Sequence, residues 1–296
     1  MNLGKKYLSI IKHHYPSLKN YQLQIFDHGW DHVIIVANQK EAFRIPRGKA
    51  YQDKLPTEVR FLEQFAPRSP ITVPQMQLHQ YKNVVYAIYD FIPGVKFEKS
   101  IQRNFSTQNR LRIAALIGQF LTALHSFSVP KAKRIGLETM NQTFSYWQNR
   151  LTHIENTVFR LISIPEQRWI KNLFTRFSAI VNQTDAKFVV NHGDIAPEHI
   201  IVNPQGQTLA GIIDFGDISI GDPAYDFQLE HPFGSEFLHT VYAHYQLPRD
   251  DTFDTRRQFY EYSQPIRVLE NSLNRHDSQL KVNQHLQELS TFINAQ

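Results

Sequence analysis

The segment that most constrains the fold is residues 191–227, which read NHGDIAPEHIIVNPQGQTLAGIIDFGDISIGDPAYDF. Two carboxylates in it, Asp194 and Asp214, each stand beside a short apolar stretch that predicts a β-strand, and the turn sequence Asn-Pro-Gln-Gly at 203–206 separates the two stretches. We therefore expect a β-hairpin here. Such a hairpin would bring both acidic side chains together, although they are twenty residues apart in the sequence.

Helical periodicity dominates the sequence around this hairpin. In 111–127, LRIAALIGQFLTALHSF, apolar residues recur at intervals of three and four, which predicts a helix with one buried face. Residues 92–296 are therefore expected to form a mainly helical lobe with a small β-rich island. The other predicted helices are 144–161, 166–181, 233–245, 252–273 and 279–292, and the strands of the island are 188–190, 200–202 and 211–214.

The first 91 residues have a different pattern, because alternating apolar positions predict a small antiparallel sheet. One helix interrupts the strands at 57–65, just after Pro56, and another precedes them at 7–14. Pro93 and Gly94 then end the last strand, so we place the boundary between two lobes, 1–91 and 92–296, at this point. The predicted strands are 21–26, 33–38, 41–45, 75–79 and 84–91. The fold class is α+β.

Composition excludes several classes of protein. With 42% hydrophobic and 20% charged residues the chain is expected to be globular, and the absence of cysteine excludes disulfides and thiolate metal sites. No apolar run approaches the roughly 18 residues of a membrane span, and the N-terminal apolar stretch is too short for a signal peptide. We therefore expect a cytoplasmic protein that does not bind or span a membrane. The basic cluster at 131–134 lacks interleaved aromatics, so it reads as a solvated loop rather than a nucleic-acid site.

Charge is unevenly distributed along the sequence. Residues 185–236 hold nine carboxylates and one lysine, a net charge of −8, while the whole chain carries +5, which leaves +13 for the remainder. An acidic block of this kind suits a site that holds a metal ion and attracts a cationic small molecule. Uneven surface charge without a function is the alternative interpretation.

The acidic hairpin has the residue types that phosphoryl transfer requires. One carboxylate must accept the proton of the attacking hydroxyl, and another must hold Mg²⁺ across the donor phosphates. The protein-kinase pattern, an Asp followed five residues later by Asn and then by Asp-Phe-Gly, is matched by Asp194, His199 and Asp214-Phe215-Gly216. The Asp-Phe-Gly motif alone is weak evidence, but its pairing with His-Gly-Asp upstream is specific.

With these motifs, the chain resembles the aminoglycoside phosphotransferase family, most closely its 2″-phosphotransferase branch, with macrolide phosphotransferases as relatives. The resemblance also covers FRIPR at 43–47, TEVRFLEQF at 57–65 and LTALHSF at 121–127. It implies a two-lobed, protein-kinase-like fold that binds ATP or GTP in its N-terminal lobe. It further implies that Asp194 is the catalytic base and that His199 and Asp214 hold Mg²⁺, although His199 stands where most of the family has asparagine.

Other site residues follow from their positions relative to these motifs. Arg44 stands where kinases place the phosphate-binding lysine, and Glu58 on the predicted helix is its natural partner. Gly29 is the single glycine of the predicted phosphate loop, and Tyr89 is a bulky aromatic at the lobe junction, as in GTP-preferring members. The full prediction assigns nucleotide binding to Arg44, Glu58, Gly29, Tyr89 and Phe91, acceptor binding to Glu198, Glu230 and Glu236, and structural support to His192, Asp217, Asp222 and Asp226.

Several alternatives stay open at this point. The acceptor could be a macrolide, choline, homoserine or a sugar amine, because the shared motifs do not select it. A nucleotide-binding pseudokinase is a second class, although the presence of both Asp194 and Asp214 argues against it. Glu58, Glu230 and Glu236 could be ordinary surface residues. His125 is interpreted as a buried or helix-capping histidine outside the site. The sequence does not specify the oligomeric state.

Overall fold

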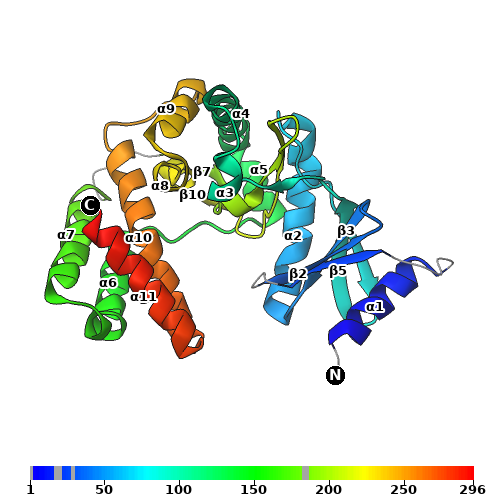
Figure 1. Cartoon of the computed structure of the whole chain (residues 1–296), viewed down its shortest axis with the longest axis horizontal. Helices are drawn as coiled ribbons and strands as arrows, with labels where there is room; N and C mark the ends of the chain where they lie inside the picture. Colours follow the sequence, from blue (N-terminus) through cyan, green and yellow to red (C-terminus); the bar gives the residue numbers. More distant parts are fainter. Residues whose placement is uncertain (1–2, 17–21, 28–30, 182–186) are drawn as a thin grey trace.

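The computed structural model describes residues 3–16, 22–27, 31–181 and 187–296. A β-sheet with two helices forms the N-terminal part, and a larger, mainly helical part follows it (Figure 1). The two termini lie in different parts of the molecule, the N-terminus beside α1 and the C-terminus at the far end of the helical part.

Five strands of the described N-terminal part form one antiparallel sheet in the order β1-β2-β3-β5-β4. β5 is the last strand of this sheet in chain order, and β6, the next strand, pairs with β8 of the helical part instead. The elements here are α1 (Leu3–His14), β1 (Leu23–Phe26), β2 (His32–Ala37), β3 (Glu41–Pro46), α2 (Lys49–Phe65), the 3₁₀ turn η1 (Ala66–Arg68), β4 (Gln77–Tyr81) and β5 (Val84–Asp90).

Alternation along β3 places the sheet between the two helices, as Figure 1 shows. Phe43 and Ile45 are fully buried in one cluster with Ile11 of α1. Ala42, on the opposite face, is buried in the other cluster with Leu62 of α2. Arg44 shares the face of Ala42, so the pleat of β3 directs its side chain toward α2.

Helix α2 begins at Lys49, eight residues earlier than the predicted start at 57, and Pro56 lies inside it. Proline removes one intrahelical hydrogen bond, which is why the sequence suggested a helix start there. Tertiary packing outweighs that loss, because Leu55, Phe61 and Phe65 are fully buried along the helix.

The predicted hairpin is present in the C-terminal part as β8 and β9. β6 pairs with β8, on the side of that strand away from β9. The predicted strand 211–214 included Asp214. In the structure β9 ends at Ile212, so Asp214 follows the strand. A separate pair of strands, β7 and β10, lies nearby, and β10 was not predicted. The bounds are β6 (Val95–Lys96), β7 (Val189–Asn191), β8 (Ile200–Asn203), β9 (Thr208–Ile212) and β10 (Ser219–Gly221).

Helices enclose this island and carry the larger core. α4 packs closely on α9, since a Cβ at Gly118 would lie 2.4 Å from the carbonyl oxygen of Val241. The bounds are α3 (Lys99–Gln102), α4 (Thr107–His125), α5 (Val129–Ile135), α6 (Phe144–Thr157), η2 (Phe159–Leu161), α7 (Ile164–Val181), η3 (Pro197–His199), η4 (Pro223–Phe227), α8 (Glu230–Phe233), α9 (Ser235–His244), α10 (Phe253–Asn274) and α11 (Gln279–Asn294).

The predicted loop at 131–134 is wrong, because these residues lie in helix α5. The Ser128 hydroxyl accepts a hydrogen bond from the backbone N–H of Lys131, and Gly136 ends the helix with φ of 104°. The side chains of Lys131, Lys133 and Arg134 are nevertheless exposed to solvent. Local capping therefore sets the backbone here, while the basic side chains remain solvated.

No single helix in the described ranges is both long and apolar enough to cross a membrane. One bent pair, α4 with α5, would pass on length and composition, with an angle of 74° between the two helices.

Candidate active site

Asp194 lies in the turn between β7 and η3, and buried backbone contacts position this turn. The carboxylate of Asp226 accepts hydrogen bonds from the backbone N–H groups of His192, at 2.7 Å, and Gly193, at 2.9 Å. Gly193 has φ of 86°, and a Cβ there would lie 2.5 Å from the carbonyl oxygen of Asp217. Only glycine fits this position, and the tight turn leaves the Asp194 side chain about half exposed, at 48%.

His199 connects the two acidic residues of the hairpin. Its Nδ1 donates a hydrogen bond to the backbone carbonyl of Asp194 at 2.9 Å and lies 3.3 Å from the Oδ2 of the same residue. Its Nε2 lies 3.5 Å from Oδ2 of Asp214. The two carboxylates therefore meet at one imidazole ring, as the hairpin pattern predicted.

Asp214 occupies the left-handed backbone region, with φ of 66°, two residues beyond β9. Its Oδ1 accepts a hydrogen bond from the guanidinium of Arg44 at 2.9 Å. Burial alone would raise the pKa of Asp214, but Arg44 and His199 together hold it well below its usual range. The strained conformation and the stabilised negative charge both mark Asp214 as a built feature of the site.

Arg44 connects the sheet to the hairpin, because it also pairs with Glu58 of α2, Nε to Oε2, at 3.3 Å. This is the partner that the sequence suggested, and both side chains are buried, which excludes the interpretation of Glu58 as a solvated residue. Burial raises the pKa of Glu58 to about 7, although Arg44 acts in the opposite direction. Five charged or titratable side chains thus form a continuous series: Glu58, Arg44, Asp214, His199 and Asp194.

The carboxyl group of Asp194 differs electrostatically from that of Asp214. Desolvation raises the pKa of Asp194 to about 6, with His199 opposing the rise and Asp217 adding to it. Asp217 is exposed on the loop between β9 and β10, and desolvation and Asp214 raise its pKa as well. A carboxylate with a raised pKa is a better proton acceptor than an ordinary one.

Asp222 lies away from this series, in a buried network with α10. Its carboxylate accepts hydrogen bonds from Nε of Arg256 at 2.6 Å and from the hydroxyl of Tyr260 at 2.9 Å. His125 of α4 contacts Asp226 with Nε2 at 3.1 Å, so it is a satisfied buried histidine, as interpreted from the sequence. Neither Arg256 nor Tyr260 was identified from the sequence, since no local motif connects them to Asp222.

The remaining predicted residues are less directly connected to the series. Tyr89 is buried on β5, paired with Ala42 and therefore on the sheet face that carries Arg44. The backbone N–H of Phe91 donates to the carbonyl oxygen of Lys40 at 2.7 Å. Gly29 lies outside the described residues.

The three glutamates proposed for acceptor binding occupy different environments. Glu198 in η3 and Glu236 in α9 are exposed to solvent. Glu230 in α8 forms an ion pair with Arg257, Oε2 to Nη2, at 2.8 Å. Its charge is therefore partly neutralised within the protein, whereas the other two remain available.

A divalent cation would depend on Asp214 and His199. Within the described ranges, no cluster of three or more His, Asp or Glu side chains is arranged to hold a metal ion. Mg²⁺ does not need such a cluster, because it usually binds one or two carboxylates, substrate phosphates and waters. In the neutral form of His199 whose Nδ1 donates to the carbonyl oxygen of Asp194, the Nε2 lone pair lies on the side of Asp214 and is open to a metal ion. The residues present therefore fit a metal that is bound together with phosphates.

Comparisons with known proteins agree with this geometry. A model of the phosphotransferase enzyme family matches residues 22–261. Viomycin phosphotransferase from Streptomyces vinaceus is 22% identical over 230 residues, which cover 75% of this chain and 77% of that protein. The GDP and kanamycin complex of APH(2″)-IIIa superposes with a TM-score of 0.87 at 22% identity, covering 97% of this chain and 98% of the other. The macrolide 2′-phosphotransferase MphH from Brachybacterium faecium gives 0.70 at 16%, covering 98% and 97%.

The fold is therefore the kinase-like fold of these antibiotic phosphotransferases, with an antiparallel sheet lobe and a mainly helical lobe. The chain belongs to the phosphotransferase enzyme family, and the resemblance inferred from its motifs is confirmed. It is an enzyme that phosphorylates a small molecule.

Proposed function

We propose that the chain transfers the γ-phosphate of ATP or GTP to a hydroxyl group of an aminoglycoside. The observation that supports this most strongly is the convergence of Asp194 and Asp214 on His199. A proton acceptor and a group that can hold a metal-bound phosphate then stand within one cluster of neighbouring side chains, which is the arrangement that phosphoryl transfer needs.

Each residue of the series has a separate task in this proposal. Asp194 orients the acceptor hydroxyl and accepts its proton, and its raised pKa suits that task. Arg44 donates hydrogen bonds to the donor phosphates, and Glu58 fixes its direction. Asp214 and His199 would hold Mg²⁺, which when bound neutralises charge on the phosphates. We place the nucleotide between lobes 1–91 and 92–296, beside Tyr89 and Phe91.

The acceptor is assigned from charge and from the relatives. Kanamycin is bound in one similar structure, and a viomycin phosphotransferase is a curated relative. The segment 185–236 carries a net charge of −8, which attracts polycationic acceptors toward Asp194. Exposed Glu198 and Glu236 are the carboxylates that we assign to acceptor binding.

A coupled phosphate-transfer assay with ATP and GTP tests this proposal across aminoglycosides, viomycin, macrolides, choline and homoserine. We expect turnover with at least one aminoglycoside and dependence on added Mg²⁺. Turnover only with a neutral or singly charged acceptor would contradict the substrate class. Tight nucleotide binding without turnover on any acceptor would contradict the enzymatic function and favour a pseudokinase.

A further inference from the structure

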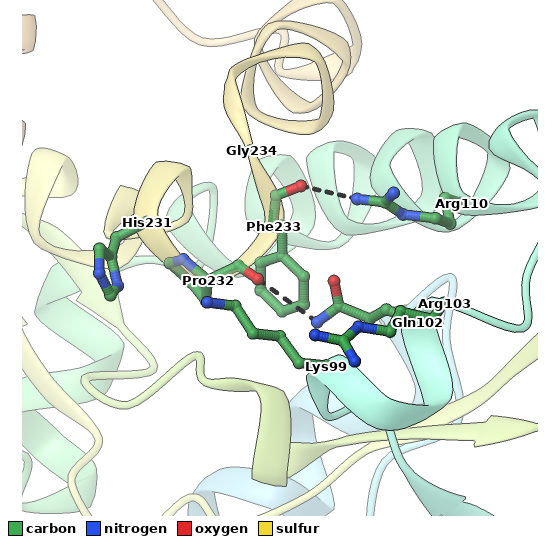
Figure 2. Close-up of a pocket in the computed structure, with 8 residues that line it drawn as sticks. All are labelled: Lys99, Gln102, Arg103, Arg110, His231, Pro232, Phe233 and Gly234. Atoms are coloured by element: carbon green, nitrogen blue, oxygen red, sulfur yellow. Dashed lines mark hydrogen bonds between the residues drawn. The ribbon is translucent and has the colours of Figure 1, made fainter.

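A concave site lies outside the Asp194 cluster, between α3, the first turn of α4 and α8. Its cavity volume is about 330 Å³, at the lower end of the roughly 300–1,000 Å³ typical of small-molecule pockets. Figure 2 shows side chains from these three elements around one space. Its polar wall consists of Lys99, Gln102, Arg103, Arg110 and His231, and Phe233 contributes an apolar side.

The wall of this pocket is basic and lacks an acidic counterpart. Lys99, Arg103 and Arg110 form no ion pair with any carboxylate of the described chain. In Figure 2, Lys99 and Arg103 extend from α3 beneath Pro232, with His231 on one side and Arg110 on the other. Burial and the nearby charge of Lys99 lower the pKa of His231, as expected in a region of positive potential.

The pocket is built from ordered groups and is more than a surface group of lysines and arginines. Nη2 of Arg110 donates to the carbonyl oxygen of Phe233 at 2.8 Å, while its Nε is buried without a hydrogen-bond partner. Gln102 is buried, and its amide donates to the carbonyl oxygens of Phe97 at 2.9 Å and Pro232 at 3.4 Å. These hydrogen bonds hold Arg110 and Gln102 in the wall of the pocket, so the positive charge of Arg110 is positioned there before any ligand binds.

We propose that this pocket binds a small oxyanion, either inorganic phosphate or the phosphate group of a monoester. Ammonium and guanidinium groups donate strong hydrogen bonds to phosphate oxygens, and the wall offers them from Lys99, Arg103 and Arg110. A cationic acceptor would be repelled by these groups, so the pocket suits a ligand of the opposite charge, although Glu236, which we assign to acceptor binding, lines the adjoining pocket with Arg110 and Phe233. The segment before the pocket contacts the η3 turn, because the backbone N–H of Phe97, two residues before Lys99, donates to the carbonyl oxygen of Pro197 at 3.0 Å.

The test is a binding titration of the full chain with inorganic phosphate, against sodium chloride at matched ionic strength. Isothermal calorimetry and the thermal unfolding midpoint are measured with and without saturating GDP, which separates this pocket from a nucleotide site. The variant is Lys99→Gln with Arg103→Gln, two exposed side chains whose loss should not affect folding. The control is Lys131→Gln with Lys133→Gln, which removes the same charge from exposed positions on α5.

We expect saturable phosphate binding that persists with GDP, weakens at least about tenfold in the Lys99/Arg103 variant and is unchanged in the control. Equal binding by the variant and the wild type, or binding that GDP abolishes, would overturn the proposal. A parallel titration with glycerol 3-phosphate distinguishes the two sources. If glycerol 3-phosphate binds more tightly than inorganic phosphate, the natural ligand is a phosphate monoester. If the two bind with equal affinity, the ligand is the free ion. Because the readout is binding, failure here is separate from failure of the phosphate-transfer assay.

Discussion

At the scale of single residues, His199 is a position where this chain departs from the kinase pattern. Its two ring nitrogens face Asp194 and Asp214, so it can orient one carboxylate and share a metal with the other. Imidazole suits transition metals better than Mg²⁺, which prefers oxygen ligands. The identity of residue 199 should therefore affect which metal supports activity.

We predict that His199→Asn lowers the ratio of Mn²⁺-supported to Mg²⁺-supported activity, because an amide oxygen replaces a nitrogen ligand. Initial rates at saturating concentrations of each ion measure this ratio. The control is His285→Asn on α11, whose imidazole pairs with Glu288, far from the Asp194 cluster in the sequence. An unchanged ratio in the His199 variant would exclude it as a metal ligand.

His32 should make the small lobe sensitive to acid. Burial and the nearby charge of Arg44 lower the pKa of His32 from 6.5 to about 3. Between these values the unfolded chain binds the proton and the folded chain does not, so stability is lost as pH falls below about 6.5. We predict that His32→Gln reduces this loss, by up to about 1.4 kcal/mol per pH unit at most.

Urea unfolding of the wild type and the His32 variant at several pH values from 7 to 4.5 measures this effect. The comparison between the two proteins matters, because Glu58 and Asp194 have raised pKa values and their contribution to stability has the opposite sign. Parallel pH profiles for the two proteins would show that His32 does not contribute.

At the scale of elements, η4 and α10 support the turn that carries Asp194 without contributing a side chain to the series from Glu58 to Asp194. Arg256 is buried, and its guanidinium pairs with Asp222 of the η4 cap and with Asp250 before α10. Asp226 of η4 in turn fixes the backbone on which Asp194 stands. A substitution of Arg256 should therefore disturb the turn that carries Asp194, through Asp222 and η4, although Arg256 does not contact that turn.

We predict that Arg256→Met destabilises the fold by about 3 kcal/mol, because Asp222 would be left buried without its ionic partner. Urea unfolding at pH 7 gives the free energy, and Arg168→Met on α7, an exposed site, is the control. A loss below about 0.5 kcal/mol, the range of ordinary surface changes, would contradict this role.

Periodicity predicted the elements whose signal is local. The strands of the N-terminal sheet, the hairpin and the helix at 111–127 could be read from alternation and from intervals of three and four. Pro56 suggested a helix start and the basic residues of α5 suggested a loop. Both predictions were wrong, because the packing of α2 and the capping of α5 determine where these helices form. The pairing of Asp222 with Arg256, and the basic pocket around Lys99, depend on contacts between distant segments, which no single stretch of sequence reveals.

At the scale of the whole molecule, the acidic segment 185–236 is enclosed by a chain that carries +13 elsewhere. This arrangement separates a negative acceptor region from positive groups such as Arg44, which can face phosphates. Added salt weakens long-range attraction of this kind, because the Debye screening length is only about 10 Å at an ionic strength of 0.1 M.

We predict that kcat/KM for a polycationic aminoglycoside falls about threefold to tenfold from low salt to roughly 0.5 M sodium chloride. A variant with Glu198→Gln and Glu236→Gln should show a shallower dependence. The control is Glu63→Gln on α2, an exposed carboxylate outside the acidic segment. Equal salt dependence in all three proteins would mean that these glutamates do not attract the acceptor.

The most direct test of the central claim is the rate of phosphate transfer by Asp194→Asn, measured together with nucleotide affinity. Asparagine keeps the shape but cannot accept the proton, so turnover should fall by about 10²–10⁴-fold, while the Kd for the nucleotide stays within about twofold. Near-normal turnover in this variant would contradict the assignment of Asp194 as the base at the site it shares with Asp214.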